Sequence, residues 1–245
     1  CRNSTGHLWK RPNDSRNKKL RNMHQITEKE ALKIQKDLIG KIKLQPLTKK
    51  IKYIAGTDIA YNKTSDTIYS GIVVLDFETM EIVAQSTVID KVAFPYIPGL
   101  LSFREIPSLM KAFNQLKIKP DVIITDGHGI AHPRKIGIAC HLGIKTNTPT
   151  IGCGKRILIG HYDNLKEKKG SSSPLIKDSE TIGYAFRGGD GLKPVFISPG
   201  HLCDLESSLN ILSKCAIGFR IPEPTRQADM MVNALRRGDI EVGSF

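Results

Sequence analysis

The chain has 245 residues, of which 40% are hydrophobic, and this is enough for a buried core in one large domain or two small ones. Lys and Arg outnumber Asp and Glu by 37 to 24, and the formal net charge of +13 favours a polyanionic partner, either nucleic acid or an anionic membrane face. Five widely spaced cysteines form no CxxC pair, which argues against a disulfide framework and a structural zinc site. No apolar run approaches the roughly 18 residues that span a membrane, so we expect a cytoplasmic protein without a membrane partner.

The first 22 residues differ in composition from the rest. They hold seven Lys or Arg against one acid and show no hydrophobic period. Such a composition is typical of a disordered segment. We therefore predict a basic disordered arm over 1–22 and a single domain over 23–245.

The first predicted elements are one helix and three strands. Thr27 and Glu30 form a capping box that opens a helix, which the Gln45–Pro46 pair would end. Residues 53–61 form a strand that carries Asp58, and residues 71–76 and 81–88 are typical of an antiparallel hairpin.

Residues 92–107 hold three prolines and a glycine among apolar residues, which predicts a rigid exposed loop and a contact surface. Proline is common at the first position of a helix. We therefore expect a helix that begins at Pro107 and has Glu105 at its entrance.

The apolar residues 122–125 predict a strand buried on both faces, and this strand ends at Asp126. Gly127 and Gly129 follow, so the backbone can turn sharply and a bulky group can approach it. The remaining expected elements are a helix after Pro133, a strand that ends at Lys155, a long exposed loop over 160–180, strands over 181–186 and 195–198, and helices over 202–212 and from the segment 219–229 onward. The predicted fold class is α/β, with a mixed central sheet of an antiparallel hairpin plus parallel strands, flanked by helices.

Three acids lie at positions where strands or helices begin or end: Asp58, Glu105 and Asp126. Each of them, taken singly, is also compatible with a cap or a surface turn. Together they could hold Mg²⁺, which prefers oxygen ligands and keeps several waters. Such a metal activates water and neutralises charge in phosphodiester cleavage, and Lys155 would add a positive charge there.

Two other kinds of site are disfavoured. His128 and His132 have a spacing compatible with a metal, but they have no Cys partner, so we expect them to bind a base or phosphate instead of zinc. The glycines near Lys155 do not have the spacing of a nucleotide-binding P-loop.

Several sequence motifs resemble the endonuclease V family and occur in that family's order over roughly residues 25–235. The resemblance rests on Gly-Thr-Asp58-Ile-Ala-Tyr61, Pro95-Tyr-Ile-Pro-Gly-Leu-Leu-Ser-Phe-Arg-Glu105, Asp126-Gly-His-Gly-Ile-Ala-His-Pro-Arg134, Gly152-Cys-Gly-Lys155, Pro199-Gly-His201 and Pro222-Glu-Pro-Thr-Arg-Gln-Ala-Asp229.

The resemblance implies a ribonuclease H-like fold and a Mg²⁺-dependent nuclease, with Mn²⁺ as a substitute, that acts as a monomer on DNA or RNA containing hypoxanthine. It would cut the second phosphodiester 3′ to the lesion and leave 3′-hydroxyl and 5′-phosphate ends. The resemblance also implies the roles of individual residues. Metal ligands would be Asp58, Asp126 and Glu105, further catalytic residues would be Lys155 and Asp229, and nucleic-acid-binding residues would be Tyr96, Ile97, Pro98, Gly99, Leu101, Gly127, His132, Arg134 and His201.

Within this set, Tyr96 would be the wedge that fills the space left by the extruded base. Gly99, Leu101, Gly127 and His132 would line the pocket that receives the base, which fits the low cost of flipping a mismatched base. Arg134 and His201 would make phosphate or structural contacts.

Two alternatives remain open at this point. A nucleic-acid-binding module could keep the fold and the wedge without cleaving, but the acids would then have no role. Another ribonuclease H-like nuclease would keep the acids, but the Pro-Tyr-Ile-Pro loop would be unexplained.

Overall fold

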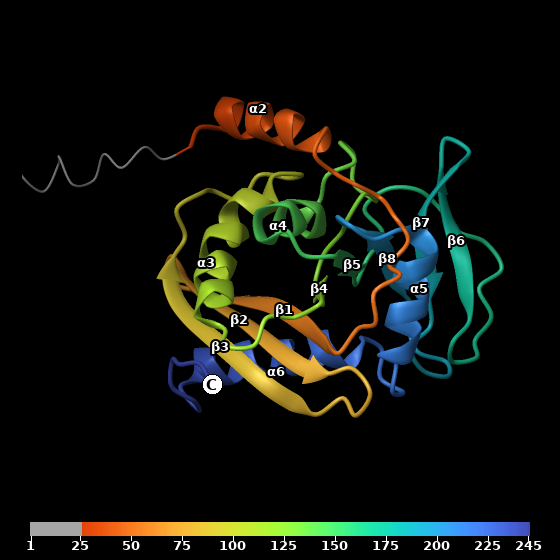
Figure 1. Ribbon diagram of the computed structural model, residues 1–245. Coiled ribbons are helices and arrows are strands. Elements are labelled where there is room, and N and C mark those ends of the chain that lie inside the picture. The colour runs from red at the N-terminus through yellow and green to blue at the C-terminus, as the bar shows by residue number, and fades with distance from the viewer. Residues whose placement is uncertain (1–25) are drawn as a thin grey trace, which may run out of the picture.

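The computed structural model describes residues 26–245, so the predicted arm over 1–22 lies outside the described residues. Its centre is an eight-stranded mixed sheet with the order β3-β2-β1-β4-β5-β8-β7-β6, and helices cover both faces (Figure 1). The elements in chain order are α2 (Glu28–Ile39), β1 (Tyr53–Tyr61), β2 (Thr67–Asp76), β3 (Ile82–Lys91), α3 (Leu101–Gln115), β4 (Val122–Thr125), α4 (Ile138–Thr146), β5 (Thr150–Gly154), β6 (Ser172–Lys177), β7 (Glu180–Phe186), β8 (Val195–Pro199), α5 (Leu205–Lys214) and α6 (Glu223–Arg237).

The pairing of the strands confirms the predicted sheet. β1, β2 and β3 form an antiparallel meander, and β4 and β5 then add parallel to β1. β8, β7 and β6 extend the sheet with antiparallel pairs. The result is a mixed sheet in which the predicted buried strand, β4, lies between two parallel neighbours.

Alternating side chains of the central strands build a separate core on each face of the sheet. Ile54 packs in one core with residues of α5 and α6, while its neighbour Ala55 packs in the other with residues of α3 and α4. Successive side chains of a strand point to opposite faces, which explains the division. The sheet is therefore covered by α3 and α4 on one side and by α5 and α6 on the other (Figure 1).

The prediction for the start of α3 was wrong. This helix begins at Leu101, six residues before Pro107, which lies inside it. A proline there removes one backbone hydrogen bond. The apolar residues before it, such as Phe103 and Ile106, are nevertheless buried, and their packing keeps the first turns helical. Glu105 thus lies within the helix and is itself buried.

The expected long loop over 160–180 was also wrong in part, because it contains β6. The strand lies at the end of the strand order next to β7, and an isolated antiparallel bridge joins its Ile176 to His161. Ser173 and Leu175 are its buried positions, and a serine at one of them conceals the alternating pattern. Other boundaries also differ from the prediction: α2 ends at Ile39, well before Pro46, β2 begins at Thr67, and α5 covers Leu205–Lys214.

The capping box of α2 is confirmed. The Thr27 hydroxyl accepts from the Glu30 backbone, and the Glu30 carboxylate accepts from the Thr27 N–H at 2.8 Å. The helix lies over the segments that lead into α3 and α4 (Figure 1), where Ala31 packs with Phe94 and Leu38 packs with Ile136. Within the described part of the chain, no helix is long and apolar enough to cross a membrane.

Candidate active site

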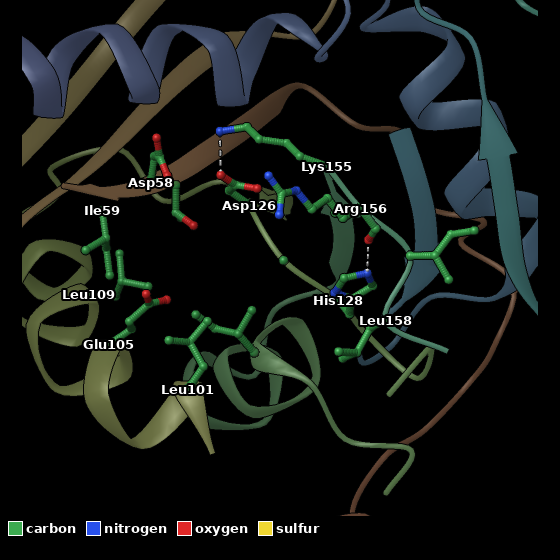
Figure 2. A pocket seen from close by; sticks show the side chains of 15 residues that line it. Asp58, Ile59, Leu101, Glu105, Leu109, Asp126, His128, Lys155, Arg156 and Leu158 are labelled. Atoms are coloured by element: carbon green, nitrogen blue, oxygen red, sulfur yellow. Dashed lines mark hydrogen bonds and ion pairs between the residues drawn. The ribbon is translucent and has the colours of Figure 1, made fainter. Parts of the chain in front are cut away.

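Asp58 and Asp126 lie side by side because β1 and β4 are parallel and in register. Thr57 pairs with Thr125, and the Asp126 N–H donates to the Thr57 carbonyl at 3.3 Å. Asp58 and Asp126 are the residues that follow these two paired threonines. Both carboxylates line a cavity of about 410 Å³ at the end of the sheet (Figure 2).

Lys155 joins these two acids to a third. It follows β5 directly, and its ammonium group lies 2.6 Å from Asp126 and 3.6 Å from Asp229 of α6. Residues separated by more than 100 positions are thus brought together at one point. The structure groups four of the five predicted catalytic residues around the Lys155 ammonium, since Asp58 also interacts with it.

Glu105 reaches the same cavity from the opposite wall, on α3 (Figure 2). Its carboxylate is 7% exposed and accepts a hydrogen bond from the Tyr61 hydroxyl at 2.7 Å. The guanidinium of Arg104 lies over the Tyr61 ring, 4.8 Å from its centroid. Tyr61 therefore fixes the orientation of Glu105, a role that the sequence motif did not reveal.

The acids have unusual proton affinities. Burial, and then the neighbouring Asp126 carboxylate, raise the pKa of Asp58 to about 8. Burial also raises the pKa of Glu105 to about 7. For Lys155, burial opposes the charged form, but Asp126 and the other two aspartates outweigh it and raise its pKa to about 12. Perturbed pKa values grouped in one cavity are typical of functional sites.

The carboxylates of Asp58 and Asp126 fit a hard divalent cation, which prefers oxygen ligands. Among residues 26–245, no three His, Cys, Asp or Glu side chains form a group that could hold a metal ion. Glu105 lies on the other wall of the same cavity, where the Asp126 carboxylate, after burial, also acts to raise its pKa. Two carboxylates are nevertheless sufficient for Mg²⁺ when substrate phosphates supply further oxygens.

A second, smaller cavity of about 140 Å³ adjoins the first. Leu101, Gly127 and His128 line both cavities. The smaller cavity is also lined by Tyr96, Gly99 and His132, so it gathers most of the predicted base-binding residues. Burial, and then Arg134, lower the pKa of His132 to about 4, so its imidazole is neutral at neutral pH, and its Nδ1 accepts a hydrogen bond from the Arg134 backbone N–H at 3.2 Å.

The turn that leads into α3 is anchored from two distant parts of the chain. Gly99 has a φ of 79°, which favours glycine. Its carbonyl accepts from Arg134 at 2.7 Å and from the side-chain amide of Gln35 at 3.0 Å, and Arg134 also donates to Gln35. Gln35 lies on α2, is 2% exposed, and further donates to Ile136 at 3.3 Å. The guanidinium of Arg134 is thus occupied by a structural contact.

Replacing Gln35 by leucine is expected to lower the free energy of unfolding by about 1–3 kcal/mol, because buried polar groups of Arg134 and Ile136 lose their partner. Urea unfolding measures this change. Lys36→Leu is the matched control, since Lys36 is the exposed neighbour on the same helix and should change stability by less than about 0.5 kcal/mol. Equal stability of both variants would show that Gln35 does not hold the turn.

Other predicted residues lie outside the cavities. His201 is 6% exposed, lines neither cavity, and accepts a hydrogen bond from the Lys43 backbone N–H at 3.2 Å. Ile97 and Pro98 belong to the loop beside Tyr96 without lining either cavity. Gly129 approaches β8 closely, because a Cβ there would lie 2.0 Å from the Pro199 carbonyl oxygen. Its small size thus serves packing within the protein.

Sequence reasoning missed Ile138 and Leu158, which line both cavities, because an apolar side chain alone does not indicate a site. His128 was expected to bind a base or phosphate, but its ring is 3.0 Å from the Arg156 carbonyl oxygen (Figure 2). Burial lowers the pKa of His128, so it packs as a neutral wall of the site.

Comparisons with known proteins agree with this geometry. The endonuclease V family model matches residues 36–230. Endonuclease V from Myxococcus xanthus is 46% identical over 221 residues, which cover 90% of this chain and 94% of that protein.

Two solved structures extend the agreement to three dimensions. The crystal structure of endonuclease V from Streptomyces avermitilis has a TM-score of 0.82 at 39% identity and covers 87% of this chain and 95% of that one. The second structure is Ciona intestinalis endonuclease V in complex with a 24mer DNA that contains an inosine followed by a ribo-adenosine. It has a TM-score of 0.75 at 29% identity, and the match covers 86% of this chain and 98% of that one. These matches confirm the ribonuclease H-like fold, and the chain belongs to the endonuclease V family of nucleases and is an enzyme.

Proposed function

We propose that this endonuclease recognises hypoxanthine in DNA, RNA or both and hydrolyses the second phosphodiester bond 3′ to the lesion, leaving 3′-hydroxyl and 5′-phosphate ends. The observation that carries this proposal is that the cavity lined by Asp58 and Asp126 adjoins the smaller cavity. Leu101 and Gly127 line both cavities. The inosine-containing DNA bound by the Ciona relative supports the same substrate class. Residues 23–245 would act as one catalytic domain.

In this proposal Asp58 and Asp126 hold Mg²⁺, with Mn²⁺ as a substitute. The bound metal would supply water activation and neutralise charge at the phosphate. Lys155 would hold a positive charge beside the scissile phosphate, where its raised pKa keeps it protonated. Asp229 would orient the Lys155 ammonium from α6, and Glu105 would complete the acidic cluster that holds the metal.

Base recognition would use the smaller cavity. Tyr96 is 67% exposed at its rim, and it would enter the strand as the base leaves. Leu101 and Gly127 would pack against the base, and the neutral imidazole of His132 would bond to its edge. A flipped base costs a few kcal/mol of stacking and pairing, and stacking on an exposed aromatic ring offsets part of that cost.

The proposal is tested with end-labelled DNA and RNA strands that each contain one inosine or deoxyinosine. With Mg²⁺ we expect a single cut one nucleotide beyond the lesion, and EDTA should abolish it. The strand that is cut faster identifies the preferred nucleic acid. Matched strands with adenosine at the same position are the control and should remain intact.

Two outcomes would contradict the proposal. Binding of inosine strands without any cut would indicate a binding module on the same fold. Equal cutting of the inosine and adenosine strands would indicate a nuclease without lesion specificity.

A further inference from the structure

Three side chains near the catalytic lysine form an exposed patch that the proposed mechanism does not use. Phe219 is 48% exposed and Met230 is 52% exposed. The guanidinium of Arg226 lies over the Phe219 ring, 4.4 Å from its centroid, and donates to the Met230 sulfur at 3.0 Å. We call these three residues the Phe219 platform. Contiguous exposed apolar groups often mark an interaction site on a protein surface.

Arg226 is held in place from below by a buried carboxylate. Glu223, which is 4% exposed, accepts from two nitrogens of the Arg226 guanidinium, at 2.6 and 2.8 Å. Gln227 donates to the same carboxylate at 2.6 Å. The guanidinium is therefore fixed as a flat surface whose charge is matched locally. A surface of this kind suits stacking better than the capture of a phosphate.

The platform is tied to the catalytic groups through two connections. Arg226 precedes Asp229 by three residues on α6, so the two side chains lie on the same side of the helix about 4.5 Å apart along its axis. Arg220, next to Phe219, donates to the Lys155 carbonyl at 2.6 Å. A strand that lies across Lys155 and Asp229 thus passes close to the platform.

The platform and the small cavity belong to elements that cover opposite faces of the sheet. The small cavity is lined from the starts of α3 and α4, which cover one face of the sheet. The platform belongs to α6 and the segment before it, and α6 covers the other face, above Lys155 in Figure 2. If a base occupies the small cavity and the cut lies on its 3′ side, the strand beyond the cut lies on the side of the platform.

We propose that the Phe219 platform is a subsite that stacks a base of the strand on the 3′ side of the cut. This inference rests on the proposed function, because the position of the cut relative to the lesion sets the direction of the strand. Since every base has a flat face, the subsite would accept any base. It would hold the product strand next to Lys155 and so keep the scissile bond in the site.

Binding of single strands in EDTA tests the proposal without cleavage. One series carries an inosine and ends one, two, three or five nucleotides beyond it. The wild-type protein should bind strands that extend past the cut more tightly than the strand that ends one nucleotide beyond the inosine. Phe219→Ala should remove this gain, a loss of roughly 5-fold or more on long strands, and should leave the shortest strand unchanged.

Abasic positions separate stacking from phosphate contacts. Strands whose nucleotides beyond the cut lack bases should bind the wild-type protein as weakly as normal strands bind Phe219→Ala, and Phe219→Ala should weaken them no further. Phe219→Trp keeps an aromatic ring, so it should still bind strands that extend past the cut more tightly than the shortest strand. Ile217→Ala is the matched control, because Ile217 is 47% exposed in the same loop and lies outside the platform.

If Phe219→Ala weakens the binding of all strand lengths equally, or of none, the proposal that the Phe219 platform stacks a base is wrong. Failure of the proposed function has a different signature. In that case the shortest inosine strand would bind no better than its adenosine counterpart, whatever the residue at position 219.

Discussion

Replacing Asp126 by alanine is expected to lower the rate of Mg²⁺-dependent cleavage by roughly 10³-fold or more while strands still bind. The substitution removes one of the two carboxylates at the centre of the site and the partner that lies 2.6 Å from the Lys155 ammonium. Groups that stabilise charge in the transition state act little on the ground state, so the loss should occur in kcat. Cleavage of an inosine strand under saturating protein, with binding measured in EDTA, separates the two effects.

Asp126→Asn and Glu206→Ala serve as controls for this result. Asparagine keeps the shape of the side chain but loses its charge, so it should be nearly as inactive as alanine. Glu206 is an exposed acid in the first turn of α5, and its removal should leave the rate unchanged. Retention of full activity in Asp126→Ala would remove Asp126 from the site.

Replacing Tyr96 by alanine is expected to weaken the binding of lesion strands by about 1–3 kcal/mol, the usual contribution of stacking on one aromatic side chain. Undamaged strands should be affected far less, because they keep their base stacked and need no wedge. Tyr96 is 67% exposed, so the protein should lose less than about 0.5 kcal/mol of stability. Titrations of paired inosine and adenosine strands measure the difference.

Tyr96→Phe keeps the ring and should preserve the preference for the lesion. If Tyr96→Ala weakens both strands equally, the side chain contributes general affinity and is not a wedge. A loss of more than about 0.5 kcal/mol in the free energy of unfolding would instead show that Tyr96 supports the loop.

Features with a local physical cause could be predicted from the sequence. The capping box at Thr27 and the strand of residues 122–125 follow from hydrogen bonding and side-chain pattern within a few residues. The positions of Asp58 and Asp126 were predicted for the same reason, since Asp58 lies within one predicted strand and Asp126 directly follows another. The motifs around these acids also led to the family that the comparisons confirm.

Other local patterns were misleading because distant packing overrides them. Pro107 predicted the start of a helix, but the burial of Phe103 and Ile106 extends α3 to Leu101. The polar residues of β6 predicted a loop, but pairing with β7 satisfies their backbone. In both cases the deciding contacts are made with residues that a local pattern does not contain.

By itself the sequence thus determined the family, the fold class and the positions of Asp58 and Asp126 relative to their strands, because these depend on short motifs and local periodicity. Only the tertiary structure decided that the Tyr61 hydroxyl donates to the Glu105 carboxylate, and that Arg134 and Gln35 fasten the turn at Gly99. It alone placed Phe219 with Arg226 beside Lys155. Each of these contacts joins side chains through the order of the strands and the packing of the helices, which no spacing along the chain encodes.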